Sequence, residues 1–67
     1  MRAWITKDTS GHRPREFYTQ KPYLSFSVWQ VDDGRFGMDM PSEMFPEIQP
    51  APGECVEIEL TAREVKP

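Results

Sequence analysis

The side chains able to do chemistry are few in this sequence and stand apart from one another. His12 is the only histidine and Cys55 the only cysteine. A general base needs an oriented partner within hydrogen-bonding reach, and only Asp8 and Glu16 are near His12 in the sequence. Cys55 is close to Glu57, and a neighbouring carboxylate raises the pKa of a thiol, which opposes its use as a nucleophile. We therefore expect no catalytic centre and predict that the protein is not an enzyme.

Metal and cofactor sites are not expected either. One Cys and one His cannot assemble a structural zinc site within one chain. Several carboxylates could bind a hard cation, but they do not follow the calcium-loop spacing. They are Asp32, Asp33, Asp39, Glu43 and Glu47. The sequence has no glycine-rich phosphate cradle, nucleophile elbow or paired-acid motif. We predict no metal and no cofactor.

Length and composition limit the elements that could position any site. The 67 residues predict a single domain, residues 1–67, near the lower size limit of independent stability. Seven prolines and four glycines interrupt every stretch long enough for a helix of average length. Four Phe, two Trp, two Tyr and four Met stand in for aliphatic residues, and each buried ring removes about 150–250 Å² from water. These features favour a mainly β domain with an aromatic core.

Five segments have the alternation or the β-branched and aromatic content of strands. They are residues 2–7, 15–20, 23–31, 35–40 and 55–65. Asp32-Asp33-Gly34 is typical of a tight hairpin turn between the third and fourth segments. Within residues 23–31, alternation places Leu24, Phe26 and Val28 on one face, which we expect to be buried. The expected fold is a small antiparallel five-stranded meander that curls into a half-barrel.

One short helical turn is expected near residues 42–45. Ser42 is a suitable N-cap, and Pro46 disfavours helix at Phe45 and ends the turn. We expect this turn to place Met44 and Phe45 under the sheet as an apolar plug.

The chain has more rings and methionines than the single buried face of a small sheet can hide. They are Trp4, Phe17, Tyr18, Tyr23, Trp29, Phe36, Met38, Met40, Met44 and Phe45. Exposed Trp, Tyr and Met are enriched where proteins bind proteins. We predict a non-catalytic protein–protein interaction module that binds its partner through exposed rings among Trp4, Tyr18, Tyr23 and Trp29. A homo-oligomer, in which these rings meet each other, is an alternative.

The positive charges are concentrated in the first 21 residues, although the net charge of the chain is −3. Lys7, Arg13 and Arg15 lie in or beside the first predicted hairpin, among rings that could stack on bases. A nucleic-acid-binding accessory protein that uses these three residues is therefore a second hypothesis. The acidic net charge opposes it, because phosphate binding depends on a basic surface. The acidic residues of the remaining chain either imitate a phosphate backbone or only confer solubility.

Several short motifs follow one another in a recognisable order. They are Trp4-Ile5-x-Lys7-Asp8, Lys21-Pro22, Trp29, Met40-Pro41-x-x-Met44-Phe45-Pro46-Glu47 and Val56-Glu57-Ile58-Glu59-Leu60. In this order the sequence resembles a family of small uncharacterised proteins of phages, prophages and bacterial mobile elements. The resemblance covers roughly the whole chain and implies a phage or mobile-element accessory protein, which could inhibit or modulate a host protein such as a defence nuclease. The family offers no activity to carry over.

We expect the protein to act in the bacterial host cytoplasm. No run of residues approaches the roughly 18 apolar residues that cross a membrane, and no basic-then-apolar leader opens the chain. A single cysteine also suits a reducing compartment.

Overall fold

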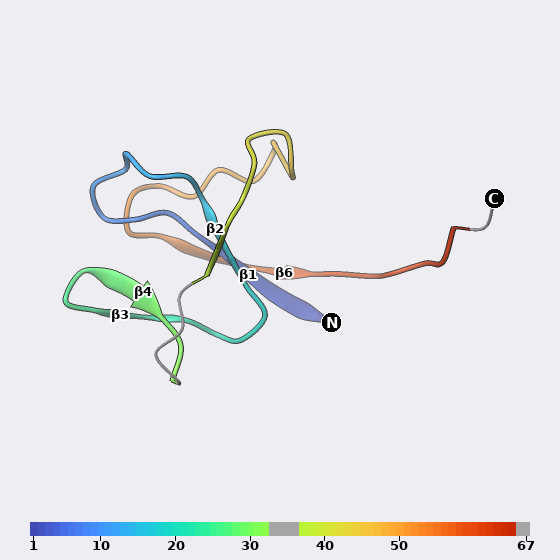
Figure 1. Ribbon diagram of the computed structural model, residues 1–67, viewed down its shortest axis with the longest axis horizontal. Coiled ribbons are helices and arrows are strands. Elements are labelled where there is room, and N and C mark those ends of the chain that lie inside the picture. Colours follow the sequence, from blue (N-terminus) through green and yellow to red (C-terminus); the bar gives the residue numbers. More distant parts are fainter. Residues whose placement is uncertain (33–36, 66–67) are drawn as a thin grey trace.

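A computed structural model describes residues 1–32 and 37–65 of the chain, which form strands, turns and loops without a helix (Figure 1). The strands are β1 (Arg2–Thr6), β2 (Glu16–Tyr18), β3 (Tyr23–Ser25), β4 (Val28–Gln30), β5 (Met38–Asp39) and β6 (Cys55–Glu59). They form a four-stranded antiparallel sheet in the order β5-β2-β1-β6 and a separate β3–β4 hairpin. The mainly β fold class predicted from the sequence is confirmed.

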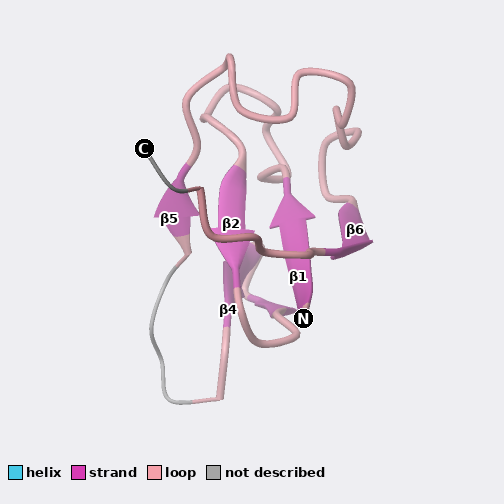
Figure 2. Cartoon of the chain, turned by 90° about the vertical axis from the view of Figure 1, so that its right-hand side faces the viewer, coloured by secondary structure: helices cyan, strands magenta, loops and turns pink. Residues whose placement is uncertain are grey.

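β1 is one of the two inner strands of the larger sheet (Figure 2). It pairs with β2 on one side, where Trp4 lies opposite Tyr18, so the predicted first hairpin is present. On its other side it pairs with β6 over its full length, from Arg2↔Glu59 to Thr6↔Cys55. The first and last strands are therefore neighbours, and the order is not the consecutive one of a meander. Ala3 and Ile5 are fully buried at the middle of this sheet.

Residues 23–31 were expected to form one strand, but they form a hairpin with a two-residue turn at Phe26 and Ser27. The φ angles of these two residues are 51° and 66°. Positive φ at both central positions is the geometry of a type I′ turn, whose twist matches that of the flanking strands. The predicted pairing of residues 23–31 with 35–40 is also wrong, because β5 pairs with β2 and β3 pairs with β4. The predicted turn at residues 32–34 and the start of the strand 35–40 fall largely outside the described residues.

An aromatic cluster joins the β3–β4 hairpin to the larger sheet. Tyr18, Trp29 and Val31 are buried together, and Trp4 and Cys55 pack against them. The Tyr18 hydroxyl donates a hydrogen bond to the carbonyl oxygen of Trp29 at 3.0 Å, which gives the polar tip of the buried ring a partner. A side chain at Gly37 would collide with the same tyrosine, because an added Cβ would lie 2.6 Å from its Cε1 atom.

Two consecutive turns replace the helical turn expected near residues 42–45. The Met44 N–H donates to the carbonyl of Pro41, and the Ile48 N–H donates to the carbonyl of Phe45. Phe45 has a φ of 47°, which breaks any helical course between the two turns. Phe45 is half-buried, whereas Met44 is 44% exposed, so the expected two-residue plug is wrong for Met44.

These two turns close around the guanidinium of Arg15, which is only 4% exposed. Its Nη1 donates to the carbonyl oxygens of Phe45 and Ile48, each at 2.8 Å. Its Nη2 lies within hydrogen-bonding distance of three more carbonyl oxygens, those of Pro41 (3.1 Å), Ser42 (3.5 Å) and Met44 (2.5 Å). The backbone carbonyls of the loop 41–48 are thus held by one buried cation, and helical hydrogen bonds do not hold this loop.

Substitution of Arg15 by Met is expected to leave the domain largely unfolded at room temperature. Hydrogen bonds from a charged donor contribute about 1.5–3 kcal/mol each, while a core of this size supplies at most about 5 kcal/mol in total. Thermal unfolding followed by circular dichroism measures the effect. Arg13→Met is the matched control, because Arg13 is exposed, and it should melt close to the parent. A similar melting temperature for Arg15→Met would contradict the role of the guanidinium.

Candidate functional site

The β3–β4 hairpin presents four exposed apolar side chains, which we call the hairpin surface: Tyr23, Leu24, Phe26 and Val28. The exposed fractions of Tyr23, Leu24 and Val28 are 43–46%, and that of Phe26 is 99%. The hairpin projects from one side of the larger sheet, and its turn lies at the far end (Figure 1). An apolar group gathered on one projecting element is the kind of surface that proteins use to bind proteins.

The backbone at the tip of this hairpin is strained. Phe26 and Ser27 occupy the left-handed region, where Gly, Asn and Asp are the favoured residues of a type I′ turn. Two contacts fix the hairpin to the first loop of the chain: the Trp29 Nε1–H donates to the Lys7 carbonyl at 2.9 Å, and the Thr9 hydroxyl donates to the Ser27 carbonyl at 3.5 Å. The fully exposed Phe26 ring is thus carried by a hairpin with a defined position.

The four rings that were predicted to bind a partner differ in their exposure to solvent. Tyr23 is exposed, whereas Trp4 is half-buried. Tyr18 and Trp29 are 4% and 8% exposed, so the expectation that they are exposed rings is wrong. Their polar atoms both bond to backbone carbonyls, which is how a buried Tyr or Trp is accommodated.

Sequence reasoning missed Phe26 as an exposed residue. Its alternation with Leu24 and Val28 predicted a buried face, but the turn breaks that alternation at residue 26. The local signal that would have found it is two serines flanking Phe26, since Ser is a common turn residue. The expected burial of Leu24 and Val28 is wrong as well.

Of the three cationic residues of the nucleic-acid hypothesis, the structure brings Lys7 and Arg13 together and buries Arg15. Arg15 is buried within the loop 41–48. The Lys7 ammonium donates to the carbonyl oxygen of Arg13 at 2.6 Å, and Lys7 is half-buried. Only Arg13 of the three is exposed.

A cleft of about 810 Å³ lies between the β3–β4 hairpin and strands β2 and β5. Its charged lining residues are Asp8, Glu16, Asp39 and Arg13, and Trp29, Val28 and Met38 contribute apolar surface. The pKa of Glu16 is raised, first because burial desolvates the carboxylate and also because Asp39 and Asp8 are near, while Arg13 opposes the shift. The pKa of Asp8 is lowered, chiefly by a hydrogen bond from the Ser10 hydroxyl. The cleft is therefore acidic, and its carboxylates differ in how easily they ionise.

The two residues with the most reactive side chains lie apart from this cleft. Cys55 is half-buried, and desolvation raises the pKa of its thiol, with a further contribution from Glu57 that Lys21 opposes. His12 is exposed in the loop between β1 and β2. Within residues 1–32 and 37–65, no group of three or more His, Cys, Asp or Glu residues is arranged to hold a metal ion.

Comparison with known proteins identified no matching family model, no similar curated protein and no similar solved structure. The part of the chain that the structure describes has no helix of the length and apolar character needed to cross a membrane.

Neutralising Glu16 is expected to stabilise the fold. Because the pKa of Glu16 is raised above its ordinary 4.5, its ionisation costs stability as the pH rises through and above that value. Glu16→Gln should therefore unfold at a higher denaturant concentration than the parent at neutral pH, and the two should converge as the pH falls below 4.5.

Asp8→Asn is the matched control, and its effect should have the opposite sign. The lowered pKa of Asp8 stabilises the fold above its ordinary value of 3.8, and this contribution is lost as the pH falls through the folded-state pKa. The variant should be less stable than the parent at neutral pH, and the difference should narrow in acid. If the free energies of unfolding of both variants and of the parent depend on pH in the same way, folding shifts the pKa of neither carboxylate, and the prediction is wrong.

Proposed function

We propose that this protein is a non-catalytic protein–protein interaction module that binds its partner through the hairpin surface. The observation that carries the proposal is Phe26, an almost fully exposed ring in the left-handed region at the tip of a hairpin. A left-handed non-glycine residue costs about 1–2 kcal/mol, and an exposed apolar ring returns nothing to the stability of the free protein. Strain of this kind is concentrated at functional sites, where a partner supplies the compensating contacts.

The kind of partner follows from the surface itself. Phe26 lies at the tip, while Tyr23, Leu24 and Val28 flank it with about half of each side chain exposed. A projecting ring surrounded by smaller apolar areas fits an apolar pocket, in which a central aromatic anchor supplies most of the binding energy. Tyr23 is the one ring named from the sequence that belongs to this surface.

The biological setting rests on the sequence motifs. Their resemblance to small phage and mobile-element proteins supports an accessory protein that acts in the host cytoplasm. Occupation of a host protein's apolar pocket would inhibit or modulate that protein. A nucleic-acid-binding role has less support, because Arg13 is the only exposed residue of the three cations that it needs.

Phe26→Asn is expected to raise the stability of the free protein and to lower its affinity for the partner. Asn adopts the left-handed region more easily than Phe, so the variant should be more stable by about 1 kcal/mol, measured by urea unfolding. Loss of an aromatic anchor commonly costs 2 kcal/mol or more in binding, so affinity for the partner should fall about thirtyfold. A less stable Phe26→Asn variant would mean that the ring supports the free fold.

The binding test compares variants in the native host. The tagged parent is used to purify a partner, which is identified by mass spectrometry, and its affinity is then measured for the parent, Phe26→Asn and Thr19→Asn. Thr19 is exposed outside the hairpin, so Thr19→Asn should bind like the parent. If Phe26→Asn retains parental affinity, or if the parent shifts labelled oligonucleotides in an Arg13-dependent manner, the proposal is wrong.

A further inference from the structure

β6 is the long open edge of the larger sheet. The opposite edge, β5, has only two residues, whereas β6 has five and continues as extended chain through residues 60–65 (Figure 1). Within the described residues, Thr61 to Val65 are exposed and take part in no backbone hydrogen bond. Open edge strands pair readily with another strand, and proteins usually keep them short or cover them.

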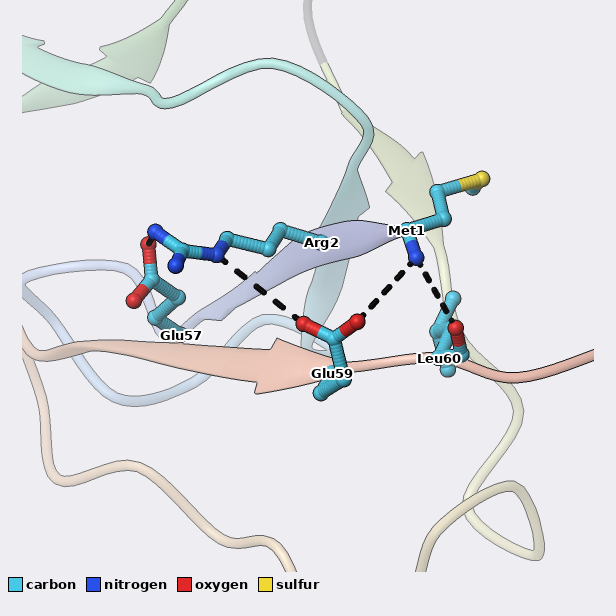
Figure 3. A network of polar contacts seen from close by, with 5 residues as sticks. All are labelled: Met1, Arg2, Glu57, Glu59 and Leu60. Atoms are coloured by element: carbon cyan, nitrogen blue, oxygen red, sulfur yellow. Dashed lines mark hydrogen bonds and ion pairs between the residues drawn. The ribbon is translucent and has the colours of Figure 1, made fainter.

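The direction of the free backbone groups on β6 follows from its pairing with β1. The Leu60 N–H donates a hydrogen bond to the Met1 carbonyl. In return, the Met1 amino group donates a hydrogen bond to the Leu60 carbonyl (Figure 3). Along an antiparallel ladder, hydrogen-bonded residue pairs alternate with pairs that are not hydrogen-bonded. The even-numbered residues of β6 therefore bond to β1. The N–H and C=O groups of the odd-numbered residues, from Cys55 onward, therefore point away from the sheet.

The side chains of β6 leave one face incompletely covered. Val56, Ile58 and Leu60 alternate on one face, and all three are only half-buried. Glu57 and Glu59 occupy the other face, where both contact Arg2, at 3.8 and 3.9 Å (Figure 3). Glu59 also contacts the terminal amino group at 3.2 Å, so Glu57 has the weaker set of cationic partners.

We propose that the segment 55–65 binds a second copy of this chain by antiparallel edge pairing, with Leu60 opposite Leu60 of the second copy. This register pairs the outward-pointing odd residues with each other, as an antiparallel ladder requires. It places Arg63 opposite Glu57 and Ala62 opposite Ile58. Opposite charges meet across the strands, and Ile58 and Leu60 on the half-buried face gain apolar neighbours.

Neighbouring registers fit the side chains less well. A register centred on Glu59 puts this glutamate opposite itself, and like charges directly opposite are destabilising. A register centred on Thr61 moves Arg63 from Glu57 to Glu59, which already contacts both Arg2 and the terminal amino group. The register centred on Leu60 avoids both conflicts, and it places Glu64 opposite Val56 near the end of the paired segment. The pairing uses no residue of the hairpin surface and is independent of the proposed function.

Self-association should be weak, because pairing of two strands buries less area than a stable interface of about 1,200–2,000 Å². Sedimentation from about 1 µM to 1 mM, the range of weak association, should show a monomer–dimer equilibrium. Thr61→Pro should abolish the dimer, because it removes an outward-pointing N–H. Ala62→Pro is the matched control, and it should retain the dimer because its N–H faces away from the second copy. Both positions lie beyond the last pair with β1, so the fold should persist in both variants.

The charge test fixes the register. Arg63→Glu should weaken the dimer about tenfold or more, since two symmetric pairs change from attraction to repulsion. Glu57→Arg combined with Arg63→Glu should restore it, whereas Glu59→Arg combined with Arg63→Glu should not. Phe26→Asn should leave the dimer unchanged. A parent that is monomeric at all concentrations, equal losses in the two proline variants, or rescue through Glu59 alone would each overturn the proposal.

Discussion

Burial of the Arg15 guanidinium is the interaction on which the rest of the structure depends. A buried cation costs several kcal/mol unless its donors are satisfied, and none of its hydrogen bonds within the described residues goes to a carboxylate. Backbone carbonyls take that place, so the loop 41–48 must turn back twice to aim its oxygens inward. The same residue acts through its main chain, because its carbonyl accepts a hydrogen bond from the Met40 N–H at 2.8 Å. One residue thus sets both the end of the β2–β5 pairing and the course of the chain that follows.

The Lys7 carbonyl has a similar joining role at the end of β1. It accepts hydrogen bonds from the Trp29 Nε1–H at 2.9 Å and from the Gly53 N–H at 3.1 Å. Three segments that are distant in sequence therefore meet at the end of β1. Gly53 has a φ of 78°, and its N–H also reaches the Asp8 carbonyl, so a residue that tolerates the left-handed region is needed there. In this short chain, a single backbone carbonyl that accepts hydrogen bonds from two distant segments holds those segments together.

The features predicted correctly from the sequence are local ones. The first hairpin and β6 follow from alternation and turn residues, which depend on near neighbours in the chain. Alternation does not specify which strand lies alongside, so the pairing of β1 with β6 was not predicted. Arg15 was considered from the sequence as a nucleic-acid contact because of its charge, and its burial was not predicted because the carbonyls that hold it have no signature in the sequence. Phe26 was missed for a related reason: the strongest sequence signal of a left-handed turn is Asn or Gly, and Phe26-Ser27 contains neither, so only the weaker signal of the flanking serines was present.

A domain of this size cannot hide all of its apolar residues, so exposure alone does not identify a functional residue. Met1 and Val65 are 68% and 84% exposed in extended chain, a conformation that any residue adopts without strain. Their exposure needs no explanation. Phe26 differs because its exposure accompanies a backbone conformation that Asn or Gly would adopt at lower free energy. Stability of the folded monomer alone favours Asn or Gly at this position, and this is the physical argument behind the proposed role of Phe26 in binding.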